Sequence, residues 1–200
     1  AEVYGDPINP ESPISEKDYG YLDPINIRAC YAESKRIGET MSVAWGNQHD
    51  IYTNIVRPFH TYGPGLSLND GRVFADFVSD IVSNRDIILK SDGNAKRTFC
   101  YISDTVSGIL TVLLSGKKNE AYNIGNPETE ITIKDLASIL VNLFPKKELK
   151  VKFEINTQNI NYLKSSISRI CPSIDKLKKL GWKPSVAIKE GFTRTIESYK

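Results

Sequence analysis

RACYAESKRIGET, residues Arg28–Thr40, carries a tyrosine and a lysine four positions apart, Tyr31 and Lys35. No Gly or Pro interrupts this window before Gly38, and we expect a helix over about residues 30–48. One helical turn then places both side chains on one face. The reference pKa of a phenol is about 10, and a neighbouring ammonium stabilises the phenolate. The pair can therefore form a general acid and base for a sugar or alcohol hydroxyl, although the same spacing also occurs on ordinary amphipathic helices.

The composition is that of a globular chain. Its 200 residues are 40% hydrophobic and 25% charged, enough for one domain or two small ones with a sizeable core. The net charge of +2, with both signs interspersed, gives no reason to expect a nucleic-acid partner. The sequence shows no long apolar run and no signal-peptide pattern, so we expect no membrane partner and a cytoplasmic location.

The cysteines predict neither disulfides nor a metal site. Cys30, Cys100 and Cys171 are odd in number and far apart, and they form no C-x-x-C pair. We expect buried free thiols and no bound metal.

Hydrophobic patterns predict strands that alternate with helices. The expected strands are the opening AEVYGDP run, Ile51–Val56, Ile87–Lys90, Phe99–Ile102, Ala121–Ile124 and Leu149–Ile155. The expected helices are 30–48, Val73–Val82, one capped by Asp104, one opened by a Thr132–Asp135 capping box, a short one capped by Ser173, and Ile188–Tyr199. The order indicates an α/β fold with a largely parallel sheet. In the first helix, the apolar stripe Ile37, Met41, Ala44 and Trp45 is expected to be core.

Further motifs follow one another in a characteristic order. They are YAESK, IYTNIVRPFHTYGPG (51–65), NDGRV (69–73), RTFCYISD (97–104), YNIGNP (122–127) and LGWKP (180–184). In this order the chain resembles, from its first residue to its last, the extended short-chain dehydrogenase/reductase family. The resemblance is to its nucleotide-sugar epimerases, dehydratases and decarboxylases in particular. Tyr31 and Lys35 coincide with the family's Tyr-x-x-x-Lys.

The resemblance implies the C-terminal part of a Rossmann-like parallel sheet, interleaved with a smaller α/β substrate-binding domain. Residues 1–65 would be NAD-binding and 66–200 mainly substrate-binding, with 98–126 packing back on the Rossmann sheet. The glycine-rich dinucleotide fingerprint is missing, since only Gly63 and Gly65 are closely spaced. We therefore expect the N-terminal dinucleotide-binding half to be absent, and these residues alone to be inactive and to bind NAD poorly.

The resemblance also implies roles around the cofactor. Tyr31 would take a proton from the sugar C4 hydroxyl as NAD is reduced, and Lys35 would lower the phenol's proton affinity and hold the nicotinamide ribose. Pro58 and Phe59 would flank the nicotinamide, or else be a strand end and core. Glu2 matches a catalytic glutamate in Glu-Val-Tyr-Gly, with a solvated side chain as the alternative.

Four cationic or polar residues would bind the nucleotide sugar. Arg97 matches an arginine that contacts the diphosphate, and Arg169 lies near a second one, with a surface cation as the alternative. His60 stands where the family has an asparagine that touches the diphosphate, although a structural histidine is the alternative. Arg72 would assist the substrate loop or merely begin the following helix.

The expected activity is epimerisation of a UDP- or dTDP-sugar through oxidation at C4. The dehydratases carry an aspartate at the position of Ala1, and the decarboxylases an arginine at the position of Ile170. UDP-glucuronate decarboxylase and dTDP-glucose 4,6-dehydratase remain alternatives. A non-catalytic nucleotide-sugar-binding fragment is the alternative from another class, and a homodimer of the full-length protein is expected by family analogy.

Overall fold

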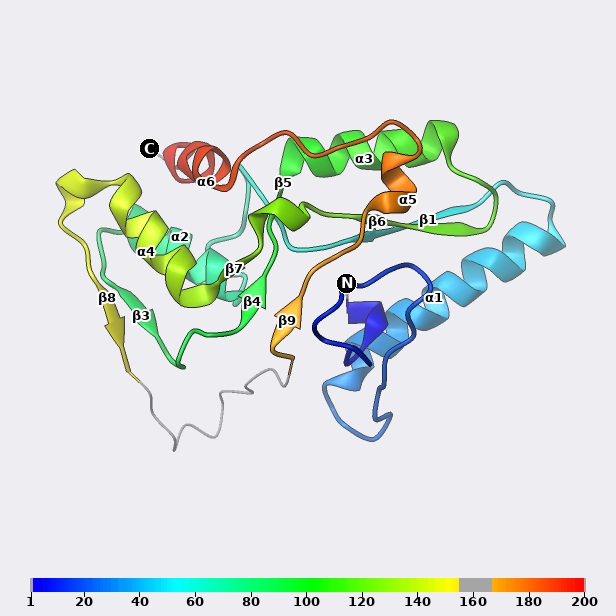
Figure 1. Ribbon diagram of the computed structural model, residues 1–200, viewed down its shortest axis with the longest axis horizontal. Helices are drawn as coiled ribbons and strands as arrows, with labels where there is room; N and C mark the ends of the chain where they lie inside the picture. Colours follow the sequence, from blue (N-terminus) through cyan, green and yellow to red (C-terminus); the bar gives the residue numbers. More distant parts are fainter. Residues whose placement is uncertain (1, 155–166, 200) are drawn as a thin grey trace.

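The computed structural model describes residues 2–154 and 167–199 and confirms an α/β fold (Figure 1). The helices are α1 (Ala29–Gln48), α2 (Val73–Val82), α3 (Ile102–Ser115), α4 (Ile133–Leu143), α5 (Asp175–Lys178) and α6 (Ile188–Glu197). Short 3-10 turns are η1 (Glu2–Tyr4), η2 (Pro127–Thr129) and η3 (Pro145–Lys147). The strands are β1 (Asn54–Pro58), β2 (Thr61–Tyr62), β3 (Ile87–Leu89), β4 (Lys96–Arg97), β5 (Cys100–Tyr101), β6 (Glu120–Ile124), β7 (Ile131–Thr132), β8 (Val151–Phe153) and β9 (Arg169–Ile170).

Most strand pairs are parallel, as the alternating pattern predicts. β1 pairs with β6, β2 with β5, β3 with β8 and β4 with β9 in parallel, and β4 pairs with β7 antiparallel. In Figure 1, α3 lies on one side of the β1–β6 pair and α1 on the other. α2, α4 and α6 gather at the opposite end of the molecule beside β3 and β8.

Aromatic packing holds the α2, α4 and α6 end together. Tyr62 and Phe192 stack with ring centroids 4.0 Å apart, and Phe99 meets Phe192 edge to face at 5.8 Å. A smaller cluster of Tyr4, Ile14, Phe59 and Ile170 lies between the N-terminal segment and the end of β1. This second cluster contributes two of its residues, Phe59 and Ile170, to the wall of the site described below.

The opening AEVYGDP run is not a strand, contrary to the prediction. Residues Glu2–Tyr4 form a 3-10 turn, and the backbone reverses at Gly5, whose φ is +64°. Apart from an isolated antiparallel bridge between Asp6 and Tyr21, no strand among the described residues pairs with this run. The carbonyl groups of Val3 and Tyr4 accept hydrogen bonds from Arg36 of α1 instead.

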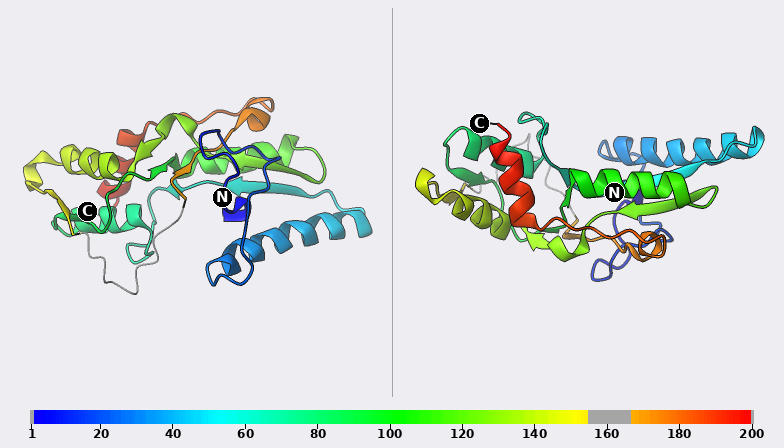
Figure 2. Two further views of the ribbon diagram at one scale, coloured as in Figure 1. Left: turned by 60° about the horizontal axis from the view of Figure 1, so that its bottom comes forward. Right: turned by 90° about the horizontal axis from the view of Figure 1, so that it is seen from above.

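The helix prediction for α1 is confirmed, but the prediction that its apolar stripe is core is wrong. Ile37, Met41 and Trp45 are 56%, 52% and 60% exposed, and Ala44 is also exposed. Both views in Figure 2 show no other described element over the outer side of α1. The helix instead packs through its other side against η1. Cys30 on the same helix is exposed too, whereas Cys100 and Cys171 are buried free thiols as expected.

The three predicted helix caps have different outcomes. Ser173 does not cap α5, whose N-cap residue is Ile174 and makes no side-chain cap hydrogen bond. Thr132 accepts a hydrogen bond from the Asp135 backbone N–H at 3.1 Å, which confirms the capping box at α4. Asp104 does not cap α3, because its buried carboxylate accepts bonds from Ser185 and Val186. The predicted strand end at Ile155 lies outside the described residues.

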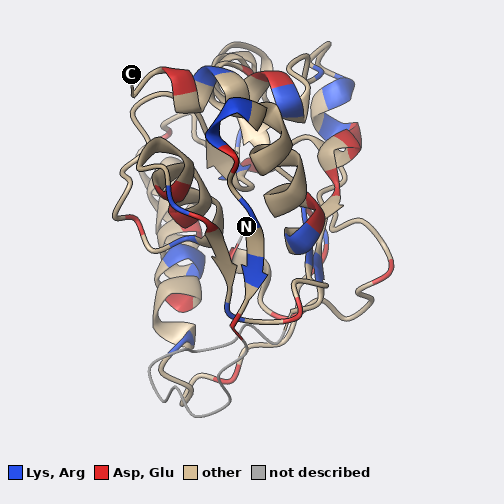
Figure 3. Cartoon of the chain, turned by 90° about the vertical axis from the view of Figure 1, so that its left-hand side faces the viewer, with Lys and Arg blue, Asp and Glu red and all other residues tan. Residues whose placement is uncertain are grey.

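The surface carries both charge signs side by side. Lysines and arginines alternate with acidic residues along the elements seen in Figure 3. Within residues 2–154 and 167–199, no helix combines the length and the apolar character needed to cross a bilayer.

Candidate active site

A cavity of about 990 Å³ lies where α1, η1 and the end of β1 face α2 and the β3–β4 segment. Its wall includes most of the residues that the sequence singled out: Glu2, Tyr31, Pro58, Phe59, His60, Arg72 and Arg97. These side chains come from five separate parts of the chain, and folding brings them around one space. Lys35 and Arg169 are outside the set of lining residues.

Tyr31 and Lys35 lie side by side on α1. The Lys35 Nζ is 5.1 Å from the centroid of the Tyr31 ring. Tyr31 is 58% exposed and borders the cavity, and Lys35 is exposed beside it. The phenol is thus accessible to a molecule in the cavity, and the Lys35 ammonium lies beside its ring.

Arg97 brings a buried positive charge to the cavity wall. It is 8% exposed, and its guanidinium donates to the carbonyl groups of Lys96 at 2.8 Å and Ile167 at 2.9 Å. No carboxylate among the described residues forms an ion pair with Arg97. Burial lowers the pKa of Arg97, and the nearby carboxylate of Glu2 opposes this shift. A guanidinium in this state suits an anionic ligand such as a phosphate.

His60 places an uncharged imidazole next to this arginine. The ring packs against Phe99 and Phe74, with centroids 5.8 and 6.2 Å away. Burial lowers the pKa of His60 to about 3, and the positive charges of Arg97 and Arg72 add to the shift. Its buried Nδ1 has no hydrogen-bond partner among the described residues. Among the described residues, this nitrogen is therefore a buried polar atom left unsatisfied.

The other two predicted arginines are held by carboxylates. Arg72 is paired with Asp70, and that hydrogen bond is the main reason that its pKa is raised, with Tyr31 adding to the effect. Arg169 is paired with Glu130 and also donates to the carbonyl of Glu11 at 2.6 Å. The structure thus gives Arg169 a role in tying β9 to the N-terminal loop.

Two charged residues of the cavity wall were not predicted from the sequence. Asp76 of α2 and Lys90, which follows β3, both line the cavity. Burial raises the pKa of Asp76, and Lys90 opposes that shift. Neither residue belongs to a motif, and only the packing of α2 beside β3 brings the two together.

Three of the four residues that the sequence assigned to the cofactor line the cavity together. Tyr31, Pro58 and Phe59 border one space, and Lys35 extends along the Tyr31 ring. Among the described residues no group of three or more His, Cys, Asp or Glu side chains could hold a metal ion.

Comparison with known proteins defines the class of protein. Residues 1–125 match the model of the NAD dependent epimerase/dehydratase family, and the chain belongs to this family. The match confirms the resemblance drawn from the motifs and identifies NAD as the family's cofactor. The chain is 35% identical over its whole length to UDP-glucuronic acid decarboxylase 6 of Arabidopsis thaliana. It covers 55% of that protein, so it spans about half the length of the curated relatives it matches.

Solved structures share the fold at low sequence identity. The dTDP-glucose 4,6-dehydratase of Bacillus anthracis, in complex with NAD, matches 99% of the chain with a TM-score of 0.79 and 22% identity. The UDP-glucose 4-epimerase of Thermotoga maritima, with UDP-glucose, matches 98% with a TM-score of 0.81 and 21% identity. The chain covers 58% and 59% of these two structures. The likeness establishes the fold, and it covers dehydratases and epimerases alike.

Proposed function

We propose that the protein carrying this chain is an NAD-dependent enzyme that oxidises a nucleotide sugar at C4, with epimerisation as the net reaction. The observation that supports this most directly is the cavity shared by Tyr31, Glu2 and Arg97. It brings a phenol and a carboxylate, which can both transfer protons, together with a buried cation. Membership of the NAD dependent epimerase/dehydratase family supports the cofactor.

The oxidation begins when Tyr31 Oη accepts the proton of the C4 hydroxyl, as a general base. The Lys35 ammonium would stabilise the phenolate that this requires. With the cofactor present, Lys35 would hold the nicotinamide ribose, and Pro58 and Phe59 would flank the nicotinamide. When bound, NAD supplies an acceptor for the C4 hydrogen and its electron pair. The sugar is left with a ketone at C4, and return of the same hydrogen and electron pair to its other face would give the epimer. Tyr31 then returns its proton to the new hydroxyl.

The diphosphate of the substrate is the group that the cationic wall would bind. The Arg97 guanidinium can form charge-assisted hydrogen bonds to phosphate oxygens, and His60 lines the same cavity beside it. Arg72 is a weaker candidate because Asp70 already neutralises it. Arg169 is weaker still, since Glu130 holds it outside the cavity wall.

Glu2 would act on the sugar next to the oxidised carbon. A ketone at C4 makes the adjacent C–H acidic, and the exposed carboxylate of Glu2 borders the same cavity. It can therefore serve as a base there or polarise a hydroxyl. The dehydratases' aspartate would stand at Ala1, which lies outside the described residues.

UDP-glucuronate decarboxylation is the second candidate, and the 35% identity to a plant decarboxylase favours it. One position speaks against it. Where the decarboxylases have an arginine, this chain has Ile170, which is 6% exposed and lines the cavity with an apolar side chain. An isoleucine there cannot donate a hydrogen bond to a carboxylate substrate.

Products distinguish these candidates. The whole protein would be incubated with NAD and, separately, UDP-glucose, UDP-glucuronate and dTDP-glucose, and the products followed by NMR. We expect the C4 epimer of one starting sugar. A UDP-pentose would establish the decarboxylase instead, and a 6-deoxy-4-keto sugar the dehydratase.

A non-catalytic nucleotide-sugar-binding protein is the alternative from another class. It would bind UDP or dTDP, measured by thermal shift, and give no product with any sugar. The homodimer and the cytoplasmic location remain expectations from the family, and light scattering of the whole protein tests the first.

A further inference from the structure

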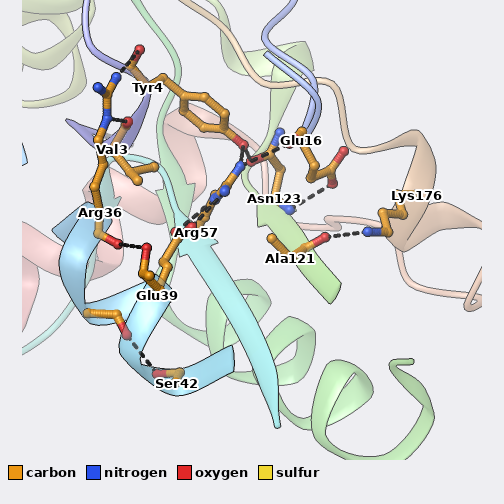
Figure 4. Close-up of polar contacts among 12 residues, drawn as sticks. Val3, Tyr4, Glu16, Arg36, Glu39, Ser42, Arg57, Ala121, Asn123 and Lys176 are labelled. Carbon is orange, nitrogen blue, oxygen red and sulfur yellow. Dashed lines mark hydrogen bonds and ion pairs between the residues drawn. The ribbon is translucent and has the colours of Figure 1, made fainter. Parts of the chain in front are cut away.

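Two arginines, Arg36 and Arg57, join the segments that carry Glu2, Tyr31 and Pro58 into the cavity wall. Arg36 belongs to α1, five residues after Tyr31, and Arg57 belongs to β1, directly before Pro58. Figure 4 shows both guanidinium groups reaching into the space between α1, η1 and the strands. Neither residue lines the cavity itself.

Arg57 fixes α1 against β1. Its Nε donates to Glu39 Oε1 at 2.8 Å and its Nη2 to Glu39 Oε2 at 2.6 Å, a two-point contact that sets orientation as well as distance. Glu39 lies two helical turns after Tyr31. Because Arg57 is only 7% exposed, this pair is shielded from solvent and salt.

The same guanidinium also reaches the N-terminal segment. Arg57 Nη1 donates to the hydroxyl of Tyr4 at 2.9 Å, and that hydroxyl donates to Asn123 of β6 at 2.5 Å. Tyr4 is 2% exposed, and burial is the main cause that raises its pKa. The hydroxyl therefore keeps its proton and can bridge the two groups.

Arg36 holds η1 against α1. Its Nε donates to the carbonyl of Val3 at 2.8 Å, and its Nη2 donates to that of Gly20 at 2.9 Å. These carbonyl groups belong to a turn and a loop that no strand among the described residues pairs with. Arg36 thus supplies the donors that a neighbouring strand would otherwise give.

Each connection ends beside a residue of the cavity wall. The cavity wall includes Glu2, Tyr21 and Pro58. Each is the direct sequence neighbour of a connected residue: Val3, Gly20 and Arg57, respectively. Tyr31 itself is mostly exposed, so packing of its own ring does little to fix it. The position of its phenol depends on the placement of α1, and that of Glu2 on the placement of η1.

We propose that Arg36 and the Arg57–Glu39 pair are positioning residues, which hold Tyr31 and Glu2 in reacting geometry at the cavity wall. This inference rests on the proposed function for its kinetic consequence. It predicts that loss of Arg36 slows the chemical step, since small displacements of a catalytic group cost up to about 100-fold in rate. Substrate affinity should be kept, because Arg97 and His60 lie elsewhere on the wall.

The kinetic test uses Arg36→Met in the whole protein, since methionine keeps the apolar stem and removes every donor. We expect kcat to fall about 10- to 100-fold, with KM for the nucleotide sugar changed less than about twofold. Arg36→Lys should recover part of the loss, because an ammonium can still donate to Val3 and Gly20. The matched control is Arg194→Met, which removes a guanidinium that pairs with Glu190 and lies 6.0 Å from the Tyr101 ring, away from the cavity wall. Wild-type kcat in Arg36→Met, or a change confined to KM, would refute the positioning role.

A second readout does not depend on turnover. Hydrogen exchange in Arg36→Met should be faster at the amides of Gly5, Asp6 and Tyr21, which hydrogen-bond within the N-terminal segment, than in the wild type. Exchange in β1 and β6 should be unchanged. If the wild type turns over no nucleotide sugar but this local change is seen, the proposed function fails and the structural coupling stands. Unchanged exchange at these three amides would overturn the coupling itself.

Discussion

Tyr31 is the residue on which the proposed chemistry depends most. Tyr31→Phe removes the phenolic oxygen and leaves the ring beside Lys35. We expect kcat of the whole protein to fall about 100- to 10,000-fold, the usual range for loss of a general acid and base. Binding of UDP, measured by calorimetry, should be unchanged.

Tyr52→Phe is a matched control for this substitution. The Tyr52 hydroxyl donates to the carbonyl of Gly116 at 2.7 Å, and the residue is outside the cavity wall. Its kcat should stay near that of the wild type. Equal losses in both variants would attribute the effect of Tyr31→Phe to the fold.

His60 makes stability depend on pH in a predictable direction. Its pKa is about 3 in the folded chain and about 6.5 in an unfolded one, so between these values the unfolded state binds more protons. The free energy of unfolding should therefore fall as pH drops below about 6.5, by at most about 1.4 kcal/mol per pH unit from this group. Urea unfolding from pH 7 to pH 5 measures the slope.

The two histidines give a direct comparison for that slope. His60→Asn removes the titrating ring and should flatten the pH dependence. His49→Asn, at an exposed position after α1, should retain the wild-type slope. A wild-type slope in His60→Asn would show that carboxylates cause the whole effect.

At the residue level, sequence and structure agree best where a contact joins residues that are close in sequence. The four-residue spacing of Tyr31 and Lys35 predicted their contact, because helical geometry alone produces it. The arginine partners could not be predicted in this way. Arg57 donates to Glu39, and Arg36 donates to the carbonyl of Val3. Both hydrogen bonds join segments that are far apart in sequence.

At the scale of elements, the capping box of α4 offers a clean stability test. Thr132→Ala removes the oxygen that accepts from the Asp135 N–H, and should lower the free energy of unfolding by about 1 kcal/mol. Thr111→Ala is the control, since the Thr111 hydroxyl only bonds back to Ser107 within α3. That change should be close to neutral. Equal losses from both would mean that the cap contributes nothing specific.

Elements with a strong periodic pattern were predicted well, and those that depend on neighbours were not. α2 runs over Val73–Val82 as its apolar repeat predicts, because that face meets an aromatic core. The AEVYGDP run has the composition of a strand, yet a strand forms only where another strand pairs with it. The prediction that the apolar stripe of α1 is core was wrong for a related reason. Periodicity indicates a face that can be buried, but it does not supply the element that would cover it.

At the scale of the whole molecule, the cavity unites residues that no local pattern could place together. Family motifs indicated which residues to consider, and folding brings Glu2, Tyr31 and Arg97 around one space. The division into residues 1–65 and 66–200 stays a prediction. So does the inactivity of these residues when they are separate from the rest of the protein.

Nucleotide binding should depend on Arg97. Arg97→Met removes the buried cation and should weaken UDP binding about 10- to 100-fold, because hydrogen bonds to a charged group contribute about 1.5–3 kcal/mol. Calorimetry on the whole protein measures the change. Arg85→Met, which loses an exposed pair with Asp80 and a hydrogen bond to Ser79, is the control and should bind normally. Unchanged affinity in Arg97→Met would exclude this arginine from the diphosphate site.

The most direct test of the central claim is a single-turnover experiment that follows the near-ultraviolet absorbance of NADH. The whole protein, loaded with NAD, would be mixed with the nucleotide sugar that gives product by NMR. We expect a transient rise in NADH absorbance in the wild type, and none in Tyr31→Phe although that variant still binds UDP. The same transient in Tyr31→Phe, or product formation without any transient reduction of NAD, would contradict oxidation at C4 by this tyrosine.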